Sequence, residues 1–174
     1  MKFKISLLTI LFTFSCFAQD NWQTYKKDNY SIDHPSDWTY SSQKPQPTIQ
    51  FVFMAKPESA REDQFQENIN LNIELLKQDD NNVDAYVDAS ISQIKSQVKG
   101  VNIIENQLTK INDLDAKSFV WSGDFGNGMI LTFKQLIFIK DKTAYILTLT
   151  CSETEYKDYI EVGDKIFNSF KFNN

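Results

Sequence analysis

The segment from residue 68 to residue 75 alternates polar and apolar side chains without exception. Its sequence is Asn-Ile-Asn-Leu-Asn-Ile-Glu-Leu, so Ile69, Leu71, Ile73 and Leu75 point to one side of an extended chain. Such a strand belongs in a sheet with one apolar face and one polar face, and sheets of this kind are commonly antiparallel. The asparagines of the polar face either meet water or line a groove.

Other stretches of the chain have the composition of strands or the spacing of helices. Strands are expected over residues 22–27, 30–33, 48–55, 101–109, 116–122, 129–140 and 143–151. Apolar residues recur at helical spacing from Val83 to Val98, after a possible cap at residues 79–82 and before Gly100, which predicts an amphipathic helix. Strands together with helices in one chain of this length predict an α+β fold.

A second helix is expected near the end of the chain. Residues 152–155 have the sequence of a capping box, Ser-Glu-Thr-Glu, and an apolar stripe follows that comprises Tyr156, Ile160, Gly163, Phe167 and Phe170. A glycine inside a helix costs about 1 kcal/mol. Its place on the apolar stripe therefore predicts that the helix approaches the sheet closely at Gly163.

Residues 1–18 have the pattern of a secretory signal peptide. Lys2 and Lys4 precede an apolar run over residues 5–17, and Ala18 supplies the small residue before a cleavage point. The expected product is a single exported domain, residues 19–174, in the periplasm or outside the cell. Cys16 keeps a lipid anchor open as an alternative, if it is modified. No later run is long enough to span a bilayer, so no transmembrane segment is expected.

The net charge argues against nucleic acid as a partner, and the number of cysteines argues against a disulfide framework. The chain has 18 basic and 23 acidic residues, a net charge of −5, and removal of the leader makes the remainder more negative still. No cluster of lysine or arginine offsets this charge, so nucleic acid is not an expected partner. Without Cys16, Cys151 is alone, so no disulfide framework is expected and Cys151 is interpreted as a buried apolar residue.

We find no catalytic, metal-binding or cofactor-binding pattern in the sequence. His34 is the one histidine of the chain, so a histidine-based zinc cluster is excluded, and no serine has the surroundings of a nucleophile elbow. No glycine-rich phosphate loop precedes either expected helix. A non-enzymatic protein is therefore expected, and a residual hydrolase alternative would depend on His34 and Cys151.

Two regions are candidates for contact with a partner. One is a glycine-rich hairpin tip over residues 123–128, and the other is a group of aromatic residues near the first loops, where a groove could open. The alternative interpretation is that the tip merely turns the chain and the aromatic residues merely pack. The candidate residues are Trp22, Trp38, Tyr40, Asp124, Phe125 and Asn127.

Several short motifs resemble those of PsbP-like proteins. Tyr25 and the sequence Tyr-Ser-Ile-Asp-His-Pro-Ser-Asp-Trp at residues 30–38 resemble the opening signature of that family, although His34 stands where the family usually has an aromatic residue before the proline. Residues 68–71, 144–150 and 166–170 resemble its central strand, late strand and closing helix. The resemblance implies a central antiparallel sheet, of about six to eight strands, flanked by helices. It also implies roles in binding or assembly.

The sequence therefore predicts an exported, non-catalytic domain that binds another envelope or secreted protein, or helps to assemble one. The alternative is a carrier of a small apolar ligand in a groove between the sheet and a helix, which the aromatic content of 14% would suit.

Overall fold

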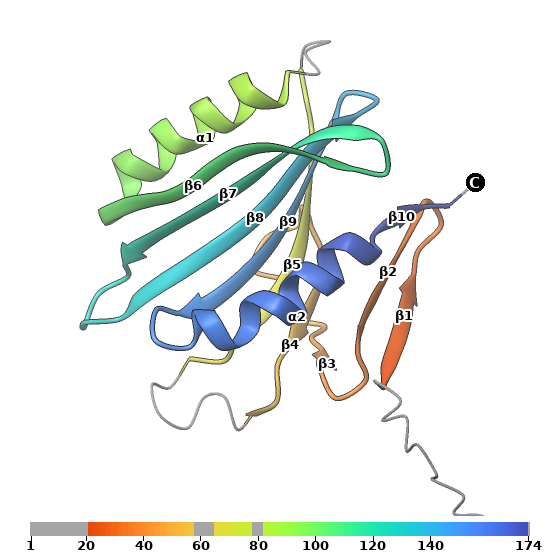
Figure 1. Cartoon of the computed structure of the whole chain (residues 1–174), viewed down its shortest axis with the longest axis horizontal. Helices are drawn as coiled ribbons and strands as arrows, with labels where there is room; N and C mark the ends of the chain where they lie inside the picture. The colour runs from red at the N-terminus through yellow and green to blue at the C-terminus, as the bar shows by residue number, and fades with distance from the viewer. Residues whose placement is uncertain (1–20, 58–64, 78–81, 174) are drawn as a thin grey trace, which may run out of the picture.

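The computed structural model describes residues 21–57, 65–77 and 82–173, which form two sheets and two helices (Figure 1). The larger sheet has seven strands in the order β3-β4-β5-β9-β8-β7-β6, and every neighbouring pair is antiparallel. These strands are β3 (Thr39–Tyr40), β4 (Ile49–Met54), β5 (Asn68–Leu75), β6 (Lys99–Ile111), β7 (Leu114–Asp124), β8 (Ile130–Lys140) and β9 (Thr143–Ser152). The predicted α+β fold with a central antiparallel sheet is confirmed.

A smaller sheet joins the two ends of the described chain. Its strands are β1 (Trp22–Lys26), β2 (Tyr30–Pro35) and β10 (Lys171–Phe172), in the order β1-β2-β10. The side-chain amide of Asn173 donates hydrogen bonds to the carbonyl oxygens of Lys27 (2.6 Å) and Tyr30 (3.0 Å). This second sheet and the short strands β3 and β10 were not predicted from the sequence.

The alternation in β5 gives the strand one apolar face. Ile69 and Leu71 are fully buried, whereas the three asparagines are half-buried on the opposite face. Leu75 was also expected on the buried face, but it is 80% exposed. The reason is that β5 ends there, opposite Thr143 at the start of β9, so no further residue of the strand packs beside it.

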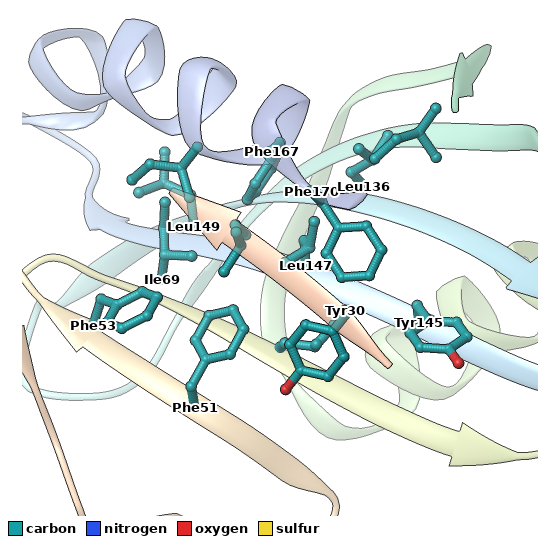
Figure 2. Close-up of a cluster of buried hydrophobic side chains, with 14 of the residues drawn as sticks. Tyr30, Phe51, Phe53, Ile69, Leu136, Tyr145, Leu147, Leu149, Phe167 and Phe170 are labelled. Atoms are coloured by element: carbon teal, nitrogen blue, oxygen red, sulfur yellow. The ribbon is translucent and has the colours of Figure 1, made fainter. Parts of the chain in front are cut away.

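Each face of the larger sheet carries its own apolar core. Helix α2 (Tyr156–Ser169) and strand β2 cover one face, where the aromatic rings of Tyr30, Phe51 and Phe53 lie below Phe167 and Phe170 (Figure 2). Helix α1 (Val83–Gln97) covers part of the other face. Because β9 lies between β5 and β8 and supplies residues to both cores, it is buried from its second residue to its last.

Helix α2 lies close to the sheet at Gly163, as predicted. A Cβ atom added there would lie 2.8 Å from Cδ2 of Leu149 on β9. At the next residue of the helix, Asp164 pairs with Lys134 of β8 at 2.6 Å. On the opposite face, the ammonium group of Lys117 on β7 pairs with Asp84 in the first turn of α1.

The structure confirms one of the two predicted helix caps and contradicts the other. Asn82 caps α1, because its side-chain oxygen accepts a hydrogen bond from the N–H of Ala85 at 3.1 Å. The capping box predicted at residues 152–155 is wrong. Ser152 is the last residue of β9, paired with Leu131 of β8, and α2 begins at Tyr156 without a side-chain cap.

Candidate functional site

The predicted hairpin tip joins β7 to β8 through residues 125–129. The carboxylate of Asp124 accepts a hydrogen bond from the N–H of Gly126 (2.8 Å), and the N–H of Phe125 donates to the carbonyl oxygen of Met129 (2.9 Å). Gly126, Asn127 and Gly128 have φ angles of 96°, 54° and 78°. Glycine tolerates such angles without strain, which explains its presence at two of the three positions. Asp124 and Asn127 therefore give the loop its shape.

Phe125 lies on the outside of this loop and is 47% exposed. Its ring packs against Phe133, at a centroid distance of 5.3 Å, and more loosely against Trp121, at 6.4 Å. Trp121 and Phe133 stack on one another at 4.2 Å with ring planes 11° apart, and the indole N–H of Trp121 donates to the side-chain oxygen of Gln135. One side of the Phe125 ring thus packs against Phe133 and Trp121, while part of the ring faces solvent.

A cavity of about 480 Å³ opens beside the tip. Its wall is formed by residues 127–130 of the loop and β8, by residues 152–154 between β9 and α2, and by Phe65. Met129, 36% exposed, lies at this wall and next to the loop of Phe125. The volume is within the range of sites that accept a small molecule or a side chain of another protein.

A buried carboxylate lies close to the wall of this cavity. Glu67 is fully buried, and its Oε1 accepts a hydrogen bond from the N–H of Ser152 at 3.2 Å. Burial, together with the nearby charges of Glu67 and Glu155, raises the pKa of the Cys151 thiol far above its ordinary value. Because the thiolate is the reactive form, Cys151 is a poor nucleophile here, in keeping with its interpretation as a buried apolar residue.

The structure brings together two of the aromatic residues predicted near the first loops. Trp22 and Trp38 both line a cavity of about 450 Å³, which also meets Asp37 and Lys165. Trp38 is 7% exposed and its ring packs against Tyr159 of α2 at a centroid distance of 6.1 Å. Trp38 therefore belongs mainly to the core, and Trp22 is the more accessible of the two.

Tyr40, the third predicted aromatic residue, lies apart from this cavity. It is 44% exposed, stacks on Tyr25 at 5.7 Å and packs against Phe53 at 6.3 Å. Burial, followed by the interaction with Tyr40, raises the pKa of Tyr25 above its ordinary value. The three predicted residues thus form no common surface, and the hairpin tip lies at another part of the molecule (Figure 1).

His34 has a packing role in the structure. Its ring stacks on Phe53 at a centroid distance of 3.9 Å, and Nδ1 lies 2.9 Å from the carbonyl oxygen of Pro35, to which the Nδ1–H donates. The ring is 4% exposed, and this burial lowers its pKa. Over residues 21–57, 65–77 and 82–173, no three His, Cys, Asp or Glu side chains are grouped as a metal site.

Some residues of the candidate site escaped the sequence analysis. Phe65 and Glu67 have no motif around them, and Ser152 was assigned to a helix cap. The signal for Met129 was its position at the edge of the glycine-rich tip. Cys16 and the signal peptide lie outside the residues that the structure describes, and in the described part no helix has the length and apolar composition to cross a bilayer.

These features define an α+β domain with a two-faced antiparallel sheet, an exposed aromatic hairpin tip and surface cavities. The chain belongs to the PsbP-like proteins, whose family model matches residues 13–172. No curated protein matches the sequence.

Solved structures with a similar fold come from several bacteria. Cyanobacterial PsbP (CyanoP) from Synechocystis sp. PCC 6803 is 13% identical, with a TM-score of 0.64 over 94% of this chain and 99% of its own. A protein of unknown function from Pseudomonas aeruginosa is 14% identical, with a TM-score of 0.60 over 86% and 95%. LpqN, involved in cell envelope biogenesis of Mycobacterium tuberculosis, is 13% identical, with a TM-score of 0.53 over 88% and 91%.

Proposed function

We propose that this protein is an exported, non-catalytic domain of the cell envelope that binds a partner protein at the β7–β8 hairpin tip. The observation that carries this proposal is the position of Phe125 and Met129. Both are large apolar side chains that are partly exposed, and Met129 lines the cavity of about 480 Å³ beside the tip. An exposed apolar group at the rim of a cavity is typical of a contact with another protein.

The tip is also built to present these side chains. Trp121 and Phe133 support the ring of Phe125 on one side. Two backbone hydrogen bonds and one from a backbone N–H to the carboxylate of Asp124 fix the loop. A side chain that is already held in place loses less conformational freedom when a partner binds it. Phe125 is therefore a better anchor than an equally exposed residue on an unsupported loop.

Export and an envelope location are supported by two observations. Residues 1–18 have the pattern of a signal peptide, and a protein of similar fold, LpqN, is described as involved in cell envelope biogenesis. We propose further that residues 19–174 act as a single domain, since the family match extends from residue 13 to residue 172.

A second candidate is a carrier of a small ligand, and one cavity favours it. A groove of about 530 Å³ lies between the start of α1 and strands β6 and β7, which is the kind of place expected for such a site. Val83 and Leu108 line it, but so do the charged residues Asp84, Lys110 and Asp115. An apolar ligand would leave these charges without water, so the groove suits a polar ligand better.

The proposal is tested by site-specific photocrosslinking in cells that make the protein. A photoreactive phenylalanine at position 125 should crosslink to one defined envelope protein, and the same residue at position 75, which is 80% exposed, should not. Phe125→Ala and Met129→Ala should each reduce co-purification of that protein at least tenfold. Equal crosslinking from both positions, or unchanged co-purification, would contradict the proposal. Small molecules that co-purify with the protein, found by native mass spectrometry, would favour the carrier.

A further inference from the structure

The two edges of the larger sheet are very different. One edge is β3, which has two residues, and the other is β6, which has thirteen (Figure 1). An edge strand carries backbone N–H and C=O groups without partners, and proteins usually protect such edges by keeping them short or charged. Among the residues that the structure describes, β6 is paired with β7 on one side and with no strand on the other, which leaves a long open edge.

The turn between β6 and β7 shows which backbone groups face outward. Asn112 and Asp113 form a two-residue turn with φ angles of 47° and 66°, the signature of a type I′ hairpin, and Ile111 lies opposite Leu114. The carbonyl of Ile111 then faces β7, because it accepts the hydrogen bond of the turn. Since successive residues alternate, the N–H and C=O groups of Asn106, Leu108 and Lys110 point away from β7.

This stretch of β6 is regular and has little protection. Register shifts interrupt the pairing before Glu105, whereas from Glu105 to Ile111 every residue has a direct partner on β7. Residues 106–110 are all exposed, and Leu108 is 65% exposed. The four residues between Glu105 and Lys110 include neither a charged residue nor a proline, the two features that usually block strand addition. Charge is present only at the ends of this stretch, where Lys110 pairs with Asp115 at 3.7 Å.

We propose that the outer edge of β6 receives an extended segment of the partner protein, which adds as a further strand beside Asn106, Leu108 and Lys110. This inference rests on the proposed function and names the form in which the partner binds at a second surface, near the β6–β7 turn, where Leu108 lies opposite Lys117. An extended backbone supplies the alternating donors and acceptors that an open edge lacks, and alternate side chains give specificity. An apolar residue of the segment packs beside Leu108.

The net charge of the chain favours a segment of another protein, rather than a second copy of this chain, as the occupant of the β6 edge. Each chain has a net charge of −5, so two copies repel one another. A segment that is uncharged or basic meets no such repulsion. The occupant is therefore a neutral or basic strand of another protein, and the acidic version of the same strand is expected to bind more weakly.

The experiment uses synthetic strands as probes, measured by hydrogen exchange and fluorescence anisotropy on the purified exported chain. The probe is a nine-residue peptide of alternating threonine and valine with a lysine at each end, and its counterpart carries a glutamate at each end. The lysine peptide should slow exchange at the N–H groups of Asn106, Leu108 and Lys110, and it should bind at least fivefold more tightly than the glutamate peptide.

The variants Leu108→Pro and Leu108→Lys should each weaken this binding at least tenfold, whereas the matched control Leu75→Lys should leave it unchanged. Proline removes an outward N–H, and lysine retains it, so the second variant remains informative if the first fails to fold. Protection from hydrogen exchange at another strand, or binding of the lysine peptide to both Leu108 variants as tight as to the unmodified protein, would overturn the proposal. So would a concentration-dependent dimer, measured by sedimentation, that Leu108→Pro abolishes.

The same variants separate this inference from the proposed function. If Phe125 crosslinks to a partner and Leu108→Pro retains that partner at full yield, the tip binds and the edge proposal is wrong. If no partner crosslinks at position 125 but the lysine peptide protects β6, strand addition stands and the role of the tip is wrong.

Discussion

Gly163 of α2 lies so close to Leu149 of β9 that a Cβ at position 163 would meet Cδ2 of the leucine at 2.8 Å. Leu149 is fully buried, so its side chain has little room to move aside. The glycine therefore fixes the depth at which the helix rests on the sheet. Each of the four predictions below follows from one such contact.

Gly163→Ala is expected to lower the free energy of unfolding by about 1 kcal/mol. The gain in helix propensity is about 1 kcal/mol, whereas overpacking of a tight core costs about 1–3 kcal/mol. In a Leu149→Val background the obstructing methyl group is gone, and the same change should become neutral or stabilising. Urea denaturation of the two pairs measures both effects. A stabilising effect of Gly163→Ala in the wild-type background would show that the contact does not matter.

The ion pair between Lys117 and Asp84 should respond asymmetrically to mutation. The side chain of Lys117 is 10% exposed and that of Asp84 is 48% exposed, so Asp84→Asn leaves a largely buried ammonium group without its partner. We expect a loss of about 2 kcal/mol, less than for a fully buried pair. Lys117→Met removes the buried charge itself and should cost about 1 kcal/mol or less.

Chemical denaturation checks this asymmetry against an exposed pair. Lys110 and Asp115 are 3.7 Å apart, with side chains 70% and 81% exposed, so Asp115→Asn should change stability by less than about 0.5 kcal/mol. If Lys117→Met proves more harmful than Asp84→Asn, the role assigned to burial of the lysine is wrong.

His34 should make stability depend on pH in the weakly acidic range. Burial lowers the pKa of His34 in the folded state below the ordinary histidine pKa of about 6.5, so the unfolded chain takes up a proton first as the pH falls. The stabilisation that the neutral ring of His34 adds to the free energy of unfolding is complete above about pH 6.5. It is lost as the pH falls toward the pKa of the folded state. His34→Phe, which can still stack on Phe53, should remove this dependence. Denaturation midpoints at pH 7.5 and pH 5.5 test it, and an equal shift in both proteins would contradict it.

Cys151 should be unreactive in the folded protein. The thiol is buried and its pKa is raised, so both access and ionisation oppose modification. In a Cys16→Ser chain, a thiol reagent at pH 8 is expected to label Cys151 at a rate that follows global unfolding and rises with added urea. Rapid labelling without denaturant would instead show an accessible thiol, and would reopen the hydrolase alternative.

Local patterns in the sequence predicted the elements well, whereas contacts between distant segments could not be predicted. The alternation at residues 68–75, the cap at Asn82 and the glycine at position 163 are visible over a few residues. The structure confirms each of them, with Leu75 at the end of β5 as the exception to the alternation. The extension of β9 through Ser152 depends on its pairing with β8 and on the buried carboxylate of Glu67. No short pattern reports a contact of that kind.

The candidate site, too, could be predicted only where a local sequence signal marks it. The glycine-rich tip and Phe125 were predicted because turn residues are a local signal, and the tip lies at the end of the β7–β8 hairpin. The cavity beside it depends on Phe65 and on residues 152–154, which come from distant parts of the chain. Trp22, Trp38 and Tyr40 were predicted as one group, and the structure brings Trp22 and Trp38 to one cavity, but Tyr40 stacks on Tyr25 instead.

The central position of β9 has a consequence for the time at which the chain can fold. β5 and β8 are neighbours of β9 in the sheet, yet β9 is the last of the seven strands to be synthesised. Until residues 143–152 are present, β5 lacks one partner strand and neither apolar core is complete. Such non-local pairing slows folding. A chain with this strand order cannot complete its larger sheet until most of its residues have been synthesised.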